Sequence, residues 1–166
     1  MKWTLILVFA IALMIVVLIF TLNMKLIHKL TTVLLKREDT VANYKRKNDM
    51  YEQWLKLMYR GHNISNYIKN SEYASIALFG LGEAGRLLVK ELDQSSIPID
   101  YIIEPNIDSY KYKGHIIKKD FDKAVETGAI IITEFANYDY VCERLESLLE
   151  CPIIALDELL FLVESY

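Results

Sequence analysis

An uncharged apolar segment near the amino terminus limits what this 166-residue chain can fold into. Trp3–Leu22 is a run of twenty residues without a charged residue, a glycine or a proline. At 1.5 Å per residue, a helix of this length spans about 30 Å, the thickness of the hydrocarbon core of a bilayer. We therefore expect residues 1–23 to form a transmembrane anchor. The alternatives are a cleaved signal peptide, although Thr21–Met24 offers no small-residue cleavage site, and a buried helix of a soluble protein.

Charge is distributed unevenly around this segment. Residues 1–73 have a net charge of +6 and residues 74–166 a net charge of −9. Only Lys2 precedes the apolar run, whereas seven Lys and Arg follow it by position 47, so the positive-inside rule predicts a single-pass inner-membrane protein with its amino terminus outside and its C-terminal domain cytoplasmic. The expected partner is the lipid bilayer. The acidic C-terminal part would repel a phosphate backbone, so we expect no nucleic acid partner.

Residues 24–73 are predicted to form a helical juxtamembrane linker, because residues 24–60 contain neither glycine nor proline. Mostly apolar residues recur there at alternating spacings of three and four, as in the seam of a coiled coil. This seam consists of Ile27, Leu30, Leu34, Arg37, Val41, Tyr44, Asn48, Tyr51, Leu55 and Met58. The pattern is compatible with a homodimer, in which Asn48 would fix the register. The alternative is an amphipathic helix that packs on its own domain.

A glycine motif marks the start of the C-terminal domain, residues 74–166. The apolar run 74–79 is typical of a buried parallel strand, and residues 86–92 show helical spacing. Between them lies Gly80-Leu81-Gly82-Glu83-Ala84-Gly85, a G-x-G-x-x-G sequence in the strand–helix context that dinucleotide binding requires. The glycines permit a tight turn, close approach of a diphosphate and close helix packing. We expect that diphosphate on Gly80–Gly82.

An acidic residue follows at the spacing of a ribose ligand. Glu104 ends the apolar run 99–103, nineteen residues after Gly85, where a Rossmann site binds a ribose hydroxyl. No basic residue follows before Lys111, which favours NAD over NADP if a dinucleotide binds; the cofactor is NAD or another nucleotide. Alternatively, the glycines only shape a turn and hold no ligand. The candidate cofactor-binding residues are Gly80, Leu81, Gly82, Glu83, Ala84, Gly85, Glu104 and Thr133.

Strands and helices continue to alternate to the end of the chain. Further strands are expected at 115–117, 129–133 and 152–155, and helices at 121–126, 137–149 and 157–163. Such alternation predicts an α/β fold with a small doubly wound, Rossmann-like parallel sheet of five strands in the order 3-2-1-4-5.

The stretch from Ile76 to about Ala124 resembles a bacterial module, the cytoplasmic Rossmann domain of membrane-bound polysaccharide-biosynthesis proteins related to nucleotide-sugar epimerases and dehydratases. The resemblance is carried by the segments 76–86, 102–106, 114–117 and 120–122. It implies a nucleotide-binding fold, and enzymes of polysaccharide biosynthesis as partners. The larger relatives add further spans and a catalytic domain with a Tyr and a Lys four residues later, whereas none of the eleven Tyr here has Lys at that offset.

Three functions remain open. The lack of recognisable catalytic groups favours a membrane-anchored, non-catalytic nucleotide-binding module that acts as a sensor or scaffold in surface polysaccharide biosynthesis. The first alternative is a small NAD-dependent oxidoreductase or nucleotide-sugar-modifying enzyme that works with a partner; the second is an assembly adaptor with a vestigial pocket. No metal site is expected, because His28, His62 and His115 are isolated in the sequence.

Overall fold

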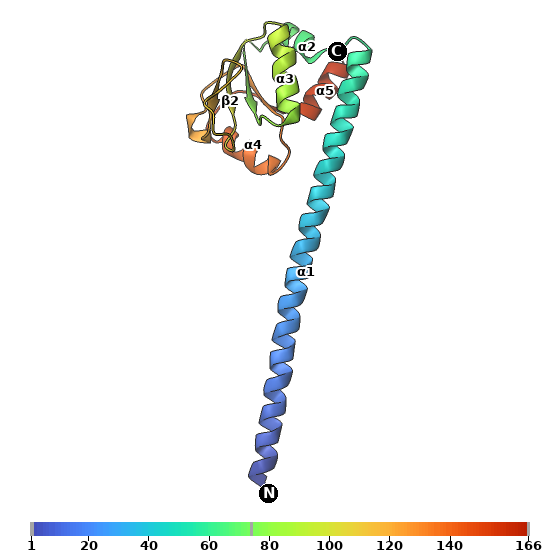
Figure 1. Ribbon diagram of the computed structural model, residues 1–166, viewed down its shortest axis with the longest axis vertical. Helices are drawn as coiled ribbons and strands as arrows, with labels where there is room; N and C mark the ends of the chain where they lie inside the picture. Colours follow the sequence, from blue (N-terminus) through green and yellow to red (C-terminus); the bar gives the residue numbers. More distant parts are fainter. Residues whose placement is uncertain (1, 74, 166) are drawn as a thin grey trace. The chain divides into compact units, whose positions relative to one another are not determined.

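The computed structural model describes the backbone of residues 2–73 and 75–165, and the side chains of these residues except 2–12, 15 and 16 (Figure 1). Residue 74, the predicted first residue of the C-terminal domain, lies outside this set, as do the side chains of 3–12, 15 and 16 in the predicted anchor. The chain divides into two compact units, Met1–Lys45 and Arg46–Tyr166.

A single helix, α1 (Lys2–Tyr59), runs through residues 2–23 of the predicted anchor and most of the predicted linker. Within the described part Val17–Tyr59, an 18-residue segment has a mean hydropathy of 1.4, and none of that segment is buried. By length and composition, the helix could therefore cross a membrane. An amino-terminal signal sequence can also be long and apolar enough to meet this criterion. The long apolar helix itself is therefore as predicted.

The second unit begins inside α1, because residues from Arg46 onward pack on the C-terminal domain. Met50, Trp54 and Leu57 are buried in its hydrophobic core. These three residues lie beside the predicted seam, whose members Leu55 and Met58 stay more than half exposed. This last part of α1 therefore packs on its own domain, through residues beside the predicted seam and not through Leu55 and Met58.

The C-terminal domain contains one six-stranded sheet in the order β3-β4-β2-β1-β5-β6. The five parallel strands have the predicted order: β4 (His115–Lys118), β2 (Ile99–Ile103), β1 (Ile76–Phe79), β5 (Ala129–Ile132) and β6 (Ile153–Ala155). The prediction of a wholly parallel sheet is wrong, because the short strand β3 (Lys111–Tyr112) pairs with β4 in the antiparallel direction. Lys113 and Gly114 both adopt positive φ angles, as a two-residue hairpin turn requires.

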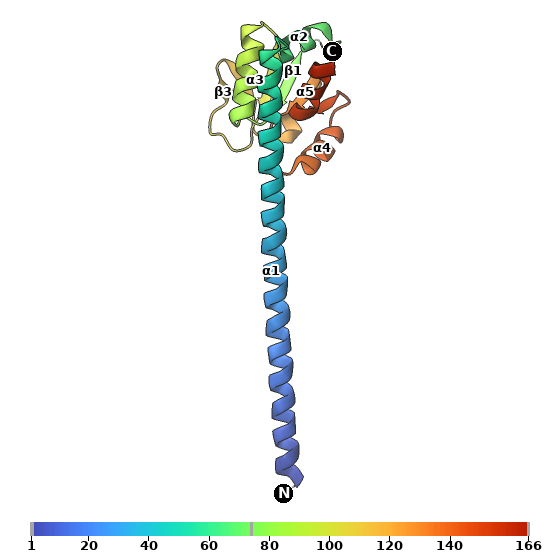
Figure 2. The same cartoon turned by 90° about the vertical axis from the view of Figure 1, so that its right-hand side faces the viewer.

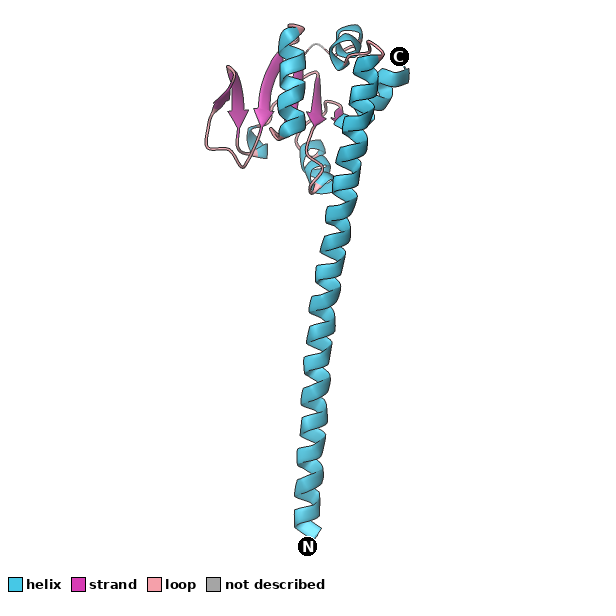
Figure 3. Cartoon of the chain, turned by 45° about the vertical axis from the view of Figure 1, so that its right-hand side comes forward, coloured by secondary structure: helices cyan, strands magenta, loops and turns pink. Residues whose placement is uncertain are grey.

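Helices cover both faces of this sheet. On one face pack α2 (Ile64–Asn70), α3 (Glu83–Gln94), α5 (Leu156–Ser165) and the buried residues of α1 (Figures 2 and 3). On the other face lie α4 (Tyr138–Glu146) and a 3-10 helix, Phe121–Lys123. Along β1, Ile76 and Leu78 face the first layer, and Ala77 and Phe79 the second. The result is an α/β domain of three layers with two apolar cores.

The predicted helix at 121–126 is wrong beyond its first turn. Ala124 is already extended, with φ −61° and ψ 145°. The hydroxyl of Tyr101 then donates a hydrogen bond to the carbonyl of Val125 and accepts one from its N–H. A buried side chain from β2 thus takes both main-chain groups that a continuing helix would have used.

Candidate functional site

The glycine loop begins with a tight turn at the end of β1. Gly80 has a φ of +96°, which favours glycine, and its N–H donates to the carbonyl of Ile103 at 2.9 Å. Behind the loop, the buried hydroxyl of Thr133 donates to the carbonyls of Phe79 and Gly80, at 3.1 and 2.9 Å. Thr133 therefore holds the loop in place.

The helix after the loop starts three residues earlier than its predicted periodic segment. Gly82 occupies the N-cap position of α3, and the N–H of Arg86 makes the first intrahelical hydrogen bond, to the carbonyl of Gly82. The N–H groups of Glu83, Ala84 and Gly85 precede that bond, at the positive end of the helix dipole. These groups, more than those of Gly80–Gly82, have the geometry to bind an anion.

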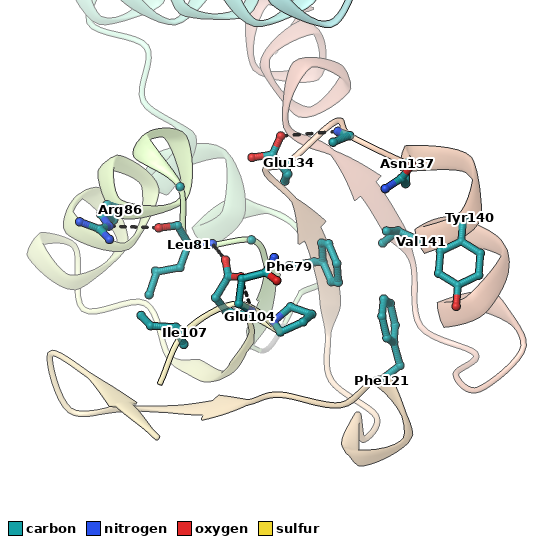
Figure 4. A pocket seen from close by; sticks show the side chains of 15 residues that line it. Phe79, Leu81, Arg86, Glu104, Ile107, Phe121, Glu134, Asn137, Tyr140 and Val141 are labelled. Carbon is teal, nitrogen blue, oxygen red and sulfur yellow. Dashed lines mark hydrogen bonds between the residues drawn. The ribbon is translucent and has the colours of Figure 1, made fainter. Parts of the chain in front are cut away.

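A pocket of about 470 Å³ opens at the carboxyl ends of β1, β2 and β5 (Figure 4). After β1 the chain passes to α3 on one face of the sheet, and after β5 to α4 on the other. In α/β sheets, ligands bind at the crevice that such a divergence creates. Its lining residues are Phe79, Gly80, Leu81, Gly82, Arg86, Glu104, Pro105, Asn106, Ile107, Phe121, Glu134, Ala136, Asn137, Tyr140 and Val141.

Glu104 points into the glycine loop. One carboxylate oxygen accepts a hydrogen bond from the N–H of Leu81 at 2.7 Å, and the other accepts from the N–H of Asn106 at 3.0 Å (Figure 4). A carboxylate of the chain itself thus accepts the hydrogen bond of the Leu81 N–H, a main-chain donor of the loop. A phosphate cannot use that donor unless Glu104 moves away, but a ligand hydroxyl can still donate to the remaining lone pairs of the carboxylate.

The three glycines of the motif differ in what a side chain would meet. A Cβ at Gly85 would lie 2.3 Å from the carbonyl oxygen of Gly80, and one at Gly80 would lie 2.9 Å from the hydroxyl of Thr133. A Cβ at Gly82 would meet only the Glu134 carboxylate, at an ordinary 3.5 Å. The first and third glycines are therefore needed for packing. The second is not needed for packing, and a ligand that approaches the backbone would explain why residue 82 is a glycine.

The predicted site residues separate into two groups. Gly80, Leu81, Gly82 and Glu104 line the pocket. The others, Glu83, Ala84, Gly85 and Thr133, are not among the lining residues, although the first three supply the N–H groups at the start of α3.

Several side chains that line the pocket were not predicted from the sequence. Arg86 directly follows the motif, and its Nε donates to the carbonyl of Leu81 at 3.0 Å. Asn137, with a left-handed φ of 57°, and Tyr140 come from the start of α4. They were detectable in principle, because residues that follow the carboxyl ends of parallel strands meet at one edge of the sheet.

The pocket has a polar end and an aromatic end. The glycine loop, Arg86 and Glu104 form the polar end. At the aromatic end, Phe121 lies 5.3 Å from Phe79 and 6.2 Å from Tyr140, measured between ring centroids. Hydrogen-bond donors beside exposed aromatic surface suit a ligand that joins an anionic group to a flat ring.

Over the part of the chain that the structure describes, no three His, Cys, Asp or Glu side chains gather as metal ligands would. Comparison with other proteins adds no assignment: no family model matches the chain, and neither a curated protein nor a solved structure matches it.

Proposed function

We propose that the chain is a membrane-anchored module with a Rossmann-like, doubly wound domain that binds a nucleotide in the pocket beside the glycine loop. The observation that carries the proposal is the position of this pocket, at the point where the chain leaves β1 and β5 toward opposite faces of the sheet. The start of α3 supplies main-chain donors for phosphate, and Glu104 supplies an acceptor for a ribose hydroxyl.

The module binds its ligand without transforming it, as a sensor or scaffold. The side chains around the pocket include Glu104, Glu134 and Arg86, but each is engaged in a hydrogen bond or ion pair within the protein. The resemblance to polysaccharide-biosynthesis proteins supports a place beside enzymes that build surface polysaccharide, on the cytoplasmic side of the inner membrane. Reporter domains fused after Lys47 test this orientation, which requires activity from cytoplasmic reporters only.

Calorimetry on the full chain in detergent micelles tests nucleotide binding. NAD, NADP, ADP, a UDP-sugar and CoA are titrated into the wild-type protein and into Gly82→Val. A branched side chain at residue 82 would occupy the path of the phosphate, so binding should vanish while the melting temperature stays close to that of the wild type.

A second candidate function is an assembly adaptor whose pocket is vestigial. It is favoured by the hydrogen bond from the Leu81 N–H to Glu104, because that bond satisfies a donor that a diphosphate would otherwise use. If none of the five compounds binds at millimolar concentration, the adaptor is the better account.

A further inference from the structure

A second group of polar side chains approaches the glycine loop from α1. The ammonium group of Lys47 lies 3.5 Å from the Glu134 carboxylate, and both side chains are about one-third exposed. That same Glu134 oxygen lies 3.5 Å from the position that a Cβ on Gly82 would take. The Glu134 carboxylate therefore lies between Lys47 and the side of Gly82 from which a phosphate would approach the loop.

Tyr51 lies one helical turn after Lys47, on the same side of α1. Its hydroxyl is shielded from solvent and, among the described residues, is the one buried side-chain polar atom without a hydrogen-bond partner. Burial raises the pKa of this phenol, and the carboxylates of Glu83 and Glu134 raise it further. Tyr51 lines a separate cavity beside Trp54 and Met58 and is not among the residues that line the glycine-loop pocket, so the phosphate contact proposed below involves Lys47 alone.

The charges at the loop explain why an anionic ligand would need Lys47. Glu83, Glu104 and Glu134 lie around the loop, and Arg86 is the cation among the lining residues. A diphosphate that enters beside Gly82 would meet the negative charge of Glu134. An ammonium group within reach of both anions removes this repulsion, and it can bind the phosphate oxygens directly.

We propose that Lys47 is a ligand-binding residue of the pocket and exchanges its ion pair with Glu134 for the terminal phosphate of a nucleoside diphosphate. This inference rests on the proposed nucleotide site and deepens it, because it makes a residue of α1 responsible for recognising the phosphate. Glu134 then acts as a competitor that holds Lys47 in place when the pocket is empty.

The test compares phosphate-bearing and phosphate-free probes. ADP, UDP, adenosine and uridine are titrated into the full chain in detergent micelles by calorimetry. Lys47→Gln should weaken binding of the diphosphates by about tenfold or more and leave the nucleosides unchanged. Lys47→Arg should keep most of the affinity. Lys56→Gln, which removes an exposed α1 lysine paired with Glu52, is the matched control and should change nothing.

Glu134→Gln provides a test in the opposite direction. If Glu134 competes with the phosphate for Lys47, this variant should bind the diphosphates several-fold more tightly than the wild type. Equal diphosphate affinity of Lys47→Gln and wild type would overturn the inference and leave the nucleotide site intact. An equal loss for diphosphates and nucleosides would also overturn it, because the role of Lys47 would then be structural. If the wild type binds none of the four probes, the inference about Lys47 is overturned, and the titrations with NAD, NADP, a UDP-sugar and CoA decide separately whether a nucleotide site exists.

Discussion

The carboxylate of Glu104, at the end of β2, accepts a hydrogen bond from the N–H of Leu81 in the glycine loop at 2.7 Å. This contact joins the two sequence features on which nucleotide binding was predicted, the glycine motif and the acidic residue nineteen positions after it. It also gives Glu104 a structural role, since the carboxylate holds the loop against the end of the neighbouring strand.

Replacement of Glu104 separates these roles. Glu104→Ala should lower the free energy of unfolding by about 1–3 kcal/mol, because two main-chain donors lose a charged acceptor. Nucleotide affinity should fall by a similar free energy if the carboxylate binds the ribose. Urea denaturation and calorimetry measure the two effects. A loss of stability in a protein that binds no nucleotide would favour the adaptor.

Alanine at the second and third glycines of the motif tests whether they are needed for packing. Gly85→Ala should lower the free energy of unfolding by about 1–3 kcal/mol or more, because its Cβ collides with the carbonyl of Gly80. Gly82→Ala should leave it within about 0.5 kcal/mol of the wild type. Thermal unfolding followed by circular dichroism distinguishes them. Equal melting temperatures for the two variants would contradict the geometry of the loop.

Arg46 connects the last part of α1 to the rest of the domain through polar and aromatic contacts. Its guanidinium makes two hydrogen bonds to Asp157, at 2.6 and 3.0 Å, and lies over the rings of Phe135 and Tyr138. The bond to Asp157 raises the pKa of Arg46. Arg46→Met should therefore lower the free energy of unfolding by about 1–3 kcal/mol.

Arg60→Met is the control for this prediction, because Arg60 makes an exposed ion pair with Glu164. Such pairs contribute about 0–1 kcal/mol. Urea denaturation measures the free energy of unfolding of both variants. A loss for Arg60→Met equal to that for Arg46→Met would show that the aromatic contacts of Arg46 contribute nothing to stability.

Alkaline pH should destabilise the domain through Tyr101. Burial raises the pKa of this phenol above 10, its ordinary value, because the charged form is poorly solvated in the core. The unfolded chain therefore releases the proton at a lower pH than the folded chain does. The stability that the neutral phenol contributes is complete below pH 10 and is lost as the pH rises through the folded pKa. In urea denaturation from pH 8 to 11.5, Tyr101→Phe should show a shallower decline than the wild type.

The predicted seam of α1 leads to a test of self-association. Leu30 and Leu34 are each more than half exposed within the single chain, so their apolar surface is available to a second copy. Leu30→Lys or Leu34→Lys should abolish crosslinked dimers of the full chain in membranes, whereas Thr32→Lys, on the opposite side of the helix, should not. If the unmodified protein gives no crosslinks, the seam is only an amphipathic face.

Local patterns in the sequence determined where most helices and strands lie. The apolar runs at 76–79, 99–103 and 129–132 form the three central strands, because a strand buried on both faces needs apolar residues at consecutive positions. The order of the parallel strands was also predictable, since right-handed crossovers leave few alternatives. The strand–loop–helix context of the glycine motif likewise located the loop and, with Glu104, one side of the pocket.

Only the tertiary structure decided which surfaces of these elements meet. Helix α1 carries two neighbouring apolar stripes, and periodicity cannot distinguish the one that packs within the chain, Met50, Trp54 and Leu57, from the one left exposed, Leu55 and Met58. The two-residue strand β3 is too short to produce a pattern. The contacts of Glu104 with Leu81 and of Lys47 with Glu134 join residues 23 and 87 positions apart. Their existence depends on how the chain places strand ends and helix faces in space, which local spacing does not encode.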